Sequence, residues 1–280
     1  MPSVLIADSG STKTQWCLVS GNKKKMFSTQ GISPYFLDAQ SLDGILRKEL
    51  LPKMKEMPDE IFYYGTGCSN PANISLVKKG LKKIFPGARV NVEHDLTGAA
   101  KALCGHGKGI ACILGTGSNS CYYNGKKVVK NSPGLGFILG DEGSGAYLGR
   151  KVLQHYLYNM FEPELTDKFR QKYSQTPDDI LNSVYRGPLP NRYLSGFTAF
   201  LAENRGHYMV ENIIEDSLND FFFTHLYKYR ESWTLPIHFT GSVAYGFRDV
   251  LAQMCSDYEL VLGKIEKDPM AGLVKYHLGK

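Results

Sequence analysis

Several features that would place a protein outside the ordinary globular class are missing from this chain of 280 residues. No apolar stretch approaches the roughly 20 residues that a membrane-spanning helix needs. The N-terminus enters a predicted strand without the basic and apolar segments of a signal peptide. Basic residues are scattered, and we interpret their densest run, Lys23–Lys25, as a solvated hairpin turn rather than a nucleic-acid surface. The sequence therefore predicts neither a membrane nor a nucleic-acid partner.

The cysteines lack any paired spacing. The six cysteines are Cys17, Cys68, Cys104, Cys112, Cys121 and Cys255. They form no CxxC motif, and Cys17 and Cys112 lie inside apolar strand patterns, where free thiols are commonly buried. This usage predicts neither a disulfide framework nor a zinc site, and it indicates a reduced, cytoplasmic protein.

The composition that remains is that of an ordinary globular protein, with 42% apolar and 21% charged residues. The length is sufficient for two domains, each with its own core. A formal net charge of +6 is modest for this length, and it would suit an anionic ligand without identifying one.

Two apolar strands each run into a loop of glycine and hydroxyl residues. Residues 4–7 precede the stretch DSGSTKT at 8–14, and residues 110–114 precede GTGSNS at 115–120. Glycine lets backbone N–H groups surround an anion, and the hydroxyls add further donors. Two such loops in separate halves, one of them opening with Asp8, predict that a nucleotide's phosphates are held from both sides together with a metal ion.

The order of predicted elements is similar in the two halves. In the first half, strands are predicted over 4–8, 15–20, 25–30, 61–64 and 90–93, with helices over 38–54 and 72–84 and another running to Leu103. In the second, strands are predicted over 110–114, 119–124, 126–130 and 237–240, with a mostly helical region over 160–230 whose aromatic stripes we interpret as core. This order predicts an α/β protein with an internal duplication, whose halves are mixed sheets flanked by helices with a cleft between them.

Four motifs follow one another along the chain. They are DSGSTKT at 8–14, LGTGSNS at 114–120, GLGFILGDEGSG at 134–145 and FTGSVA at 239–244. Together they resemble the superfamily of actin-like ATPases and sugar kinases, and in particular its branch of BadF/BadG/BcrA/BcrD-type ATPases and N-acetylglucosamine kinases. The first two resemble that branch's phosphate motifs, the third its GxGxxLGDEGSG signature, and the fourth its adenosine-contacting loop. The third is the most specific of the four.

The resemblance implies a fold and an activity. The fold would be two ribonuclease-H-like (actin-like ATPase) domains, 1–105 and 106–280, each with a mixed five-stranded sheet, the second carrying a helical insertion. The activity would be ATP-dependent phosphorylation of a sugar hydroxyl, on N-acetylglucosamine or a related hexosamine, with ATP and Mg²⁺ as cofactors. Relatives form homodimers, but a buried intrachain face would explain the helical stripes of 150–230 equally well.

Two aspartates at strand ends are the candidates for the chemistry. Asp8 would hold Mg²⁺ through water, and its alternative role is that of an Asx-turn residue opening the loop. Asp95 precedes a helix rich in small residues and would be the general base that accepts the proton of the sugar hydroxyl. Its alternative role is a helix N-cap, which needs no chemistry.

The resemblance also implies a set of binding residues. The expected nucleotide contacts are Gly10, Ser11, Thr12, Lys13, Gly115, Thr116, Gly117, Gly241 and Ser242. The expected sugar contacts are Ser118, Asn119, Gly136, Asp141 and Tyr35. Glu142 could instead be structural. Residues 31–36 lack the asparagine that hexosamine kinases often supply from this loop, so Tyr35 is expected to stack on the sugar or bind a hydroxyl in its place.

Two other functions remain open at this point. An ATPase that drives electron transfer would carry cysteines for an iron–sulfur cluster, but the second phosphate loop has none and Cys112 lies mid-strand. A non-catalytic sugar or nucleotide sensor would need neither the metal-binding Asp8 nor the basic Asp95.

Overall fold

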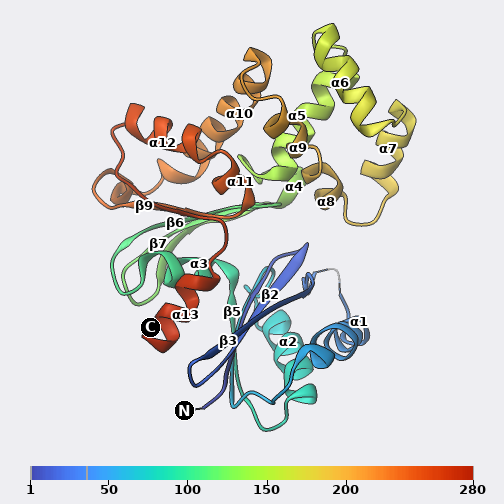
Figure 1. Cartoon of the computed structure of the whole chain (residues 1–280). Coiled ribbons are helices and arrows are strands. Elements are labelled where there is room, and N and C mark those ends of the chain that lie inside the picture. Colours follow the sequence, from blue (N-terminus) through green and yellow to red (C-terminus); the bar gives the residue numbers. More distant parts are fainter. Residues whose placement is uncertain (1, 36, 280) are drawn as a thin grey trace. The chain divides into compact units, whose positions relative to one another are not determined.

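The computed structural model describes residues 2–35 and 37–279, which form two compact units. Unit 1 comprises Met1–Gly107, Tyr123–Val128 and Asp268–Lys280, and unit 2 comprises Lys108–Tyr122 and Val129–Lys267. The predicted division after residue 105 leaves out both later segments of unit 1, and the second of them brings the C-terminal end of the chain back to this unit (Figure 1).

Unit 1 is built on a five-stranded sheet with the order β3-β2-β1-β4-β5. The strands are β1 (Val4–Ser9), β2 (Lys13–Ser20), β3 (Lys23–Gln30), β4 (Glu60–Gly65) and β5 (Arg89–His94). β1, β2 and β3 pair antiparallel, whereas β1, β4 and β5 are parallel, so the sheet is mixed as the sequence predicts. The helices are α1 (Ala39–Ile45), which continues through a π turn (Leu46–Leu50) and a 3₁₀ turn (Leu51–Lys53), α2 (Pro71–Ile84), α3 (Asp95–Cys104) and α13 (Met270–Leu278).

Both faces of this sheet are buried, because successive side chains of a strand point to opposite faces. On β1, Leu5 and Ala7 belong to the core that includes residues of α1 and α2. Val4 and Ile6 belong to a second core, which is completed by Leu273 and the other buried residues of α13. The packing of α13 on this second face explains why the C-terminal segment belongs to unit 1.

Unit 2 is built on a second five-stranded sheet with the order β10-β9-β6-β7-β8. The strands are β6 (Gly109–Leu114), β7 (Ser118–Tyr123), β8 (Val128–Ser132), β9 (Ile237–Thr240) and β10 (Leu262–Glu266). β9 pairs parallel with both β6 and β10. The duplicated α/β fold is thus confirmed, and β10 is a strand that the sequence pattern did not single out.

Helices make up most of the rest of unit 2. They are α4 (Gly136–Leu139), α5 (Gly145–Leu157), α6 (Pro163–Tyr173), α7 (Pro177–Arg186), α8 (Pro190–Ser195), α9 (Thr198–Glu203), α10 (Tyr208–Phe221), a π turn (Phe222–Leu226), a 3₁₀ turn (Arg230–Trp233), α11 (Ser242–Gly246) and α12 (Arg248–Asp257). In Figure 1, α10, α11 and α12 lie over one face of the sheet, and α6–α8 lie beyond α5. Rings such as Phe169 and Phe197, with centroids 5.8 Å apart, pack inside this region, so the aromatic stripes are core as predicted.

One local prediction is wrong. Lys23–Lys25 are the exposed first residues of β3 rather than a turn, because the turn is made by Gly21 and Asn22, where Gly21 has a φ of 58°. The strand predicted over 119–124 is confirmed as β7, which begins one residue earlier, at Ser118. None of the helices in the described part of the chain is long and apolar enough to span a membrane.

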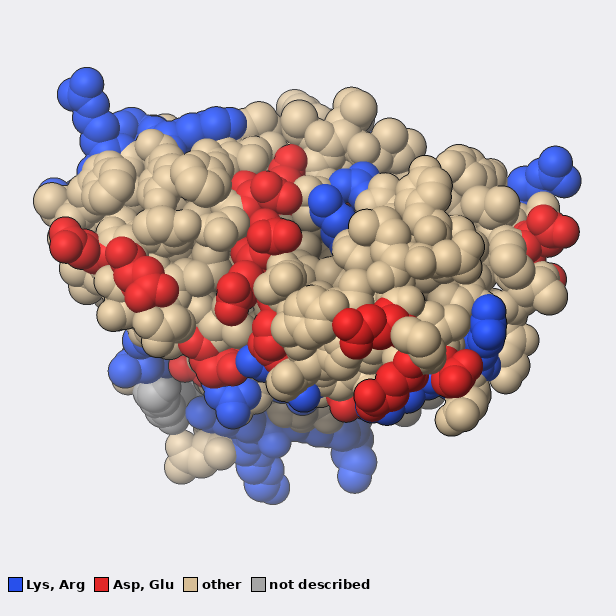
Figure 2. Space-filling view, turned by 90° about the horizontal axis from the view of Figure 1, so that it is seen from above, with Lys and Arg blue, Asp and Glu red and all other residues tan. Residues whose placement is uncertain are grey.

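The surface carries both signs of charge. On the face seen in Figure 2, acidic side chains gather in bands across the middle, and basic side chains project mainly at the margins. One hollow of about 480 Å³ in unit 2 is lined by Arg205, Glu211 and Asp249, among others. Arg205 lies 2.9 Å from Glu211 and 2.7 Å from Asp249, so its charge is neutralised and this hollow is no anion site.

Candidate active site

The parallel strands of unit 1 bring two of the predicted residues to one sheet edge. Asp8 is aligned with Tyr64 of β4, and Gly65 of β4 is aligned with His94 of β5. Asp95 follows β5 directly and is the first residue of α3. Since parallel strands end at the same edge of a sheet, Asp8 and Asp95 lie at the same side of unit 1.

The surroundings of Asp8 disfavour a negatively charged carboxylate in the absence of a cation. Burial, and then the negative charges of Asp95 and Asp268, raise the pKa of Asp8 to about 7. A bound cation would reverse this effect by favouring the ionised form. Asp268, where the chain re-enters unit 1, is a neighbour that sequence patterns did not reveal.

Among residues 2–35 and 37–279, no group of three histidine, cysteine or acidic side chains is arranged to hold a metal by itself. Mg²⁺ does not require one, because it commonly keeps several waters and is held by one or two carboxylates together with substrate phosphates. The destabilised Asp8 carboxylate therefore fits the expected Mg²⁺, with the remaining ligands coming from water and nucleotide.

Asp95 is held at the start of α3 without acting as its N-cap. The N-cap is His94, and Asp95 Oδ1 accepts a hydrogen bond from the backbone N–H of Leu96 at 2.7 Å. His94 Nε2 lies 3.1 Å from the same oxygen. The buried thiol of Cys68 is another neighbour, since burial and then the charge of Asp95 raise the pKa of Cys68 to about 12. The carboxylate is thus fixed in orientation at the sheet edge.

The first glycine-rich loop is closed by its own hydrogen bonds. Gly10 N–H donates to the carbonyl of Lys13 at 3.0 Å, and the hydroxyls of Ser9 and Thr14 lie 2.6 Å apart. Gly31 N–H donates to the carbonyl of Thr12 at 3.1 Å. A Cβ at Gly31 would lie 2.5 Å from the backbone of Ser11, so only glycine allows the chain after β3 to pack against this loop.

Tyr35 lies at the same end of unit 1 as the β4–α2 connection. Its side chain is 63% exposed, and its hydroxyl is 3.5 Å from Ser69 Oγ. Its ring lies against Gly67, which has a φ of 75° and where a Cβ would be 2.9 Å from the ring. One face of the ring is therefore open, so a ligand could stack on it. The neighbouring Phe36 lies outside the described residues.

The second glycine-rich loop, in unit 2, is held by the start of α5. The N–H of Gly145 donates to the carbonyl of Gly115 at 2.8 Å, and that of Ala146 donates to Thr116 at 3.0 Å. Within the loop, Gly115 N–H donates to the carbonyl of Gly117 at 3.0 Å. The first backbone N–H groups of α5 therefore hold this loop in position.

Asp141 meets this loop from a distant segment. It has the unusual φ of 57° and is only 9% exposed, and its Oδ1 accepts a long hydrogen bond from Ser118 N–H at 3.4 Å. Burial and then the charge of Glu142 raise its pKa to about 6, although Ser118 N–H and Arg150 oppose the shift. A Cβ at Gly117 would lie 3.0 Å from Asp141 Oδ2. The structure thus joins Asp141 and Ser118, which belong to different motifs of the sequence.

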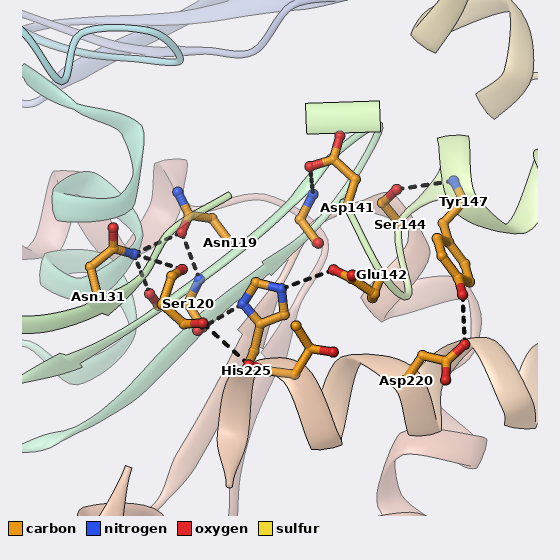
Figure 3. A network of polar contacts seen from close by, with 12 residues as sticks. Asn119, Ser120, Asn131, Asp141, Glu142, Ser144, Tyr147, Asp220 and His225 are labelled. Atoms are coloured by element: carbon orange, nitrogen blue, oxygen red, sulfur yellow. Dashed lines mark hydrogen bonds and ion pairs between the residues drawn. The ribbon is translucent and has the colours of Figure 1, made fainter. Parts of the chain in front are cut away.

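Ser118 and Asn119 present contrasting polar groups. Among the described residues, Ser118 Oγ is a buried atom without a hydrogen-bond partner. Asn119 Oδ1 accepts from Ser120 N–H and from Asn131 Nδ2, both at 2.9 Å. With its carbonyl oxygen filled, Asn119 has its NH₂ group to offer as a donor, and in Figure 3 this nitrogen points away from the network.

The remaining predicted residues of unit 2 are glycines and their neighbours. Gly136 has a φ of 77° and opens α4 five residues before Asp141. Gly241 has a φ of 122°, and a Cβ there would lie 2.2 Å from the carbonyl oxygen of Leu114 and 3.1 Å from Gly115 N. Gly241 and Ser242, at the start of α11, are thereby brought beside the second glycine-rich loop, although they lie far from it in sequence.

The buried His225 is a second residue near the predicted site that no sequence pattern indicated. It lies 3.4 Å from Glu142, which the motif suggested could be structural, and it belongs to no motif itself. A histidine inside an apolar helical stripe is indistinguishable from a packed core residue, so no signal in the sequence could have found it.

No family model matches this chain, and no curated protein matches it. The solved structure of a "putative N-acetylglucosamine kinase" from Porphyromonas gingivalis shares 42% sequence identity with it, covers 98% of both chains and superposes with a TM-score of 0.94.

Two more distant structures share the fold. A "putative N-acetylglucosamine kinase" from Chromobacterium violaceum is 17% identical over 99% of both chains, with a TM-score of 0.73. A ROK family glucokinase from Streptomyces griseus, solved with glucose and AMPPNP, is 15% identical over 98% of this chain and 97% of its own, with a TM-score of 0.57.

Proposed function

This chain belongs to the N-acetylglucosamine-kinase family of actin-like sugar kinases, and we propose that it transfers the γ-phosphoryl group of ATP to a hydroxyl of N-acetylglucosamine or a closely related hexosamine. The observation that carries the proposal is the edge of unit 1, where Asp8 and Asp95 lie beside a closed glycine- and hydroxyl-rich loop. A metal-holding carboxylate and a separate base are what phosphoryl transfer to an alcohol requires.

Asp95 is the proposed general base. Its carboxylate would accept the proton of the sugar hydroxyl as that oxygen forms its bond to the γ-phosphorus and the bond to the β–γ bridging oxygen breaks. The hydrogen bond from Leu96 N–H and the contact with His94 hold the carboxylate in one orientation. Such positioning supplies much of the rate in this class of reaction, because the protein performs little covalent chemistry itself.

Asp8 is the proposed Mg²⁺ residue, acting through water. When bound, Mg²⁺ neutralises charge on the phosphates. The first loop (Gly10, Ser11, Thr12 and Lys13) and the second (Gly115, Thr116 and Gly117) would contact the phosphates, and Gly241 and Ser242 the adenosine. The close packing of Gly241 against the second loop supports a shared role in nucleotide binding.

The sugar would be recognised mainly by Asp141, Ser118 and Asn119. Asp141 has a pKa of about 6, so it is mostly ionised at neutral pH and offers two acceptor oxygens to vicinal hydroxyls. The NH₂ group of Asn119 would donate to a hydroxyl or to an acetamido carbonyl. Gly136 would allow close approach, and Tyr35 would replace the asparagine that residues 31–36 lack.

The ATPase-activator alternative has little support in the described residues. An iron–sulfur cluster needs convergent, accessible thiols. Cys17, Cys68, Cys112, Cys121 and Cys255 are buried, and Cys104 is only partly exposed. The free thiols suit a reducing compartment, so we propose a cytoplasmic enzyme, and light scattering would test whether it is a homodimer.

The first experiment is to measure ADP release with Mg·ATP across a panel of sugars that includes N-acetylglucosamine, N-acetylmannosamine, glucosamine and glucose. We expect turnover that depends on one hexosamine and that is lost with EDTA. ADP release that ignores the sugar would contradict the proposal and favour an ATPase, and the absence of any turnover would favour a sensor.

A further inference from the structure

A buried histidine joins the two segments of unit 2 that carry the proposed sugar contacts. His225 lies in the π turn that follows α10, is 1% exposed, and stacks on Phe221 with ring centroids 4.7 Å apart. Its two ring nitrogens face different segments, as Figure 3 shows. One faces Glu142, next to Asp141, and the other faces Ser120, next to Asn119.

The contact with Glu142 bears on a strained loop. His225 Nε2 lies 3.4 Å from Glu142 Oε2. Glu142 stands between Asp141, with a φ of 57°, and Gly143, with a φ of 68°. A non-glycine residue in this left-handed region needs support from its surroundings. Gly143 supplies part of it by packing on Phe221, since a Cβ there would lie 2.8 Å from Phe221 Cβ.

The contact with Ser120 lies at the end of a second set of hydrogen bonds. His225 Nδ1 is 3.3 Å from Ser120 Oγ, which is also 2.9 Å from the hydroxyl of Tyr229. Tyr229 donates to the carbonyl of Ser120 at 3.0 Å and accepts from Ser132 N–H at 2.5 Å. Ser120 N–H in turn donates to Asn119 Oδ1 at 2.9 Å. The strand that presents Asn119 is therefore fixed from the helical side.

The two contacts of the ring differ in kind. Nε2 lies at ion-pair distance from Glu142, whose carboxylate can only accept, whereas Nδ1 is within hydrogen-bond distance of the Ser120 hydroxyl. Burial lowers the pKa of His225, and Glu142 acts in the opposite direction. His225 thus links the Asp141 loop to β7 through two polar contacts, one at each ring nitrogen.

We propose that His225 is a positioning residue for the sugar site: by holding Glu142 and Ser120 together, it sets the distance between the carboxylate of Asp141 and the amide of Asn119. The inference rests on the proposed function, because it assigns both side chains to the sugar. His225 itself touches no substrate. Its effect is therefore on sugar affinity and not on ATP affinity or on the chemical step.

The test uses two amide variants that each imitate one end of the ring. In His225→Asn the amide reaches about as far as Nδ1 and keeps the contact with Ser120. In His225→Gln it reaches about as far as Nε2 and keeps a donor toward Glu142. We expect His225→Asn to raise the KM for the sugar about tenfold, the order that loss of one polar contact with a charged group can reach, with the KM for ATP and kcat within about twofold of wild type. His225→Gln should keep most of the sugar affinity, because it retains the contact with Glu142 while Tyr229 still holds Ser120.

A double-mutant cycle with Glu142→Ala makes the test independent of stability losses. If the two residues act through one contact, the double variant His225→Asn/Glu142→Ala is no worse than the poorer single variant. The control is His155→Asn, a half-buried histidine of α5 that stacks on Phe161 away from the site. It should leave all kinetic constants unchanged.

Three outcomes would overturn the inference. They are a wild-type KM for sugar in His225→Asn, strictly additive effects in the cycle, or an equal fall in turnover at every substrate concentration, which indicates only a smaller folded fraction. Each of these leaves the kinase proposal standing as long as the wild-type enzyme phosphorylates the hexosamine. A wild-type protein that binds and phosphorylates no sugar would overturn both.

Discussion

The two glycine-rich loops follow strands in the same way but differ in where their nearest carboxylate comes from. The strand before the first loop, β1, ends in Asp8 and Ser9, so that loop carries its own carboxylate. β6 ends in Leu114 and brings none, and its loop is joined instead by Asp141 from a separate segment. The first carboxylate has a pKa of about 7 and the second of about 6, in both cases mainly because of burial.

The difference lies in what surrounds each acid. Asp8 is flanked by the further negative charges of Asp95 and Asp268, an arrangement that favours a cation. Asp141 is flanked by Glu142 but is opposed by Arg150 and by the N–H of Ser118, which suits a carboxylate that accepts hydrogen bonds from hydroxyls. Under the proposed function, the first loop would therefore serve the metal ion and the second the sugar.

The largest expected effect comes from replacing Asp95, the proposed general base, which lies at the same edge of unit 1 as the first loop. Asp95→Asn should lower kcat about 10²–10⁴-fold while leaving ATP affinity nearly intact, because the amide keeps the shape but cannot accept the proton. Steady-state kinetics and nucleotide binding by calorimetry would measure this. Asp178→Asn, on the exposed start of α7, is the matched control, and an unchanged kcat in Asp95→Asn would refute the assignment.

The next effect comes from crowding the first loop. In Gly31→Ala the new Cβ would lie 2.5 Å from the backbone of Ser11, so the loop must move. We expect a loss of about 1–3 kcal/mol in the free energy of unfolding and a higher KM for ATP. Gly44→Ala, inside α1, is the control. Its Cβ would meet nothing within 4 Å, so this variant should raise the free energy of unfolding slightly. Normal ATP kinetics in Gly31→Ala would mean that this loop does not hold the nucleotide.

A smaller and more selective effect is expected in the second loop. Gly117→Ala places a Cβ 3.0 Å from Asp141 Oδ2, whereas a Cβ at Gly115 meets no protein atom within 4 Å. Gly117→Ala should therefore raise the KM for the sugar about tenfold by displacing one charged hydrogen-bonding group. Gly115→Ala should act on the KM for ATP instead. If both variants change the same KM, the proposed assignment of Gly117 to the sugar and Gly115 to ATP is wrong.

The smallest expected effect is on thermal stability. The pKa of Asp8 is about 7 in the folded protein and near 3.8 when unfolded, so the stability linked to its proton is fully present below pH 3.8 and is lost as the pH rises through 7. Asp8→Asn should thus melt a few degrees above the ligand-free wild type at pH 8 and at the same temperature near pH 4. Mg·ATP should narrow the difference at pH 8, because it stabilises only the wild type. Parallel melting curves at every pH would contradict the buried-carboxylate argument.

Local patterns were sufficient for most of the fold. The strands around both loops and the helix Pro71–Ile84 follow from apolar periodicity and from turn residues. The turn predicted at Lys23–Lys25 is wrong because a charged run can lie on an exposed edge strand as well as in a turn. The helix predicted over 38–54 changes to π and 3₁₀ turns after Ile45, a detail that depends on how its buried face packs.

The sequence by itself determined the two loops, the duplicated sheets and the family, because these depend on residues that are adjacent in the chain. Only the tertiary structure decided that α13 returns to unit 1, that Asp268 lies near Asp8, and that His225 bridges Glu142 and Ser120. These pairings join residues distant in sequence, and burial in a shared core selects them. No local preference of the chain encodes such contacts, since each partner alone resembles an ordinary cap, turn or core residue.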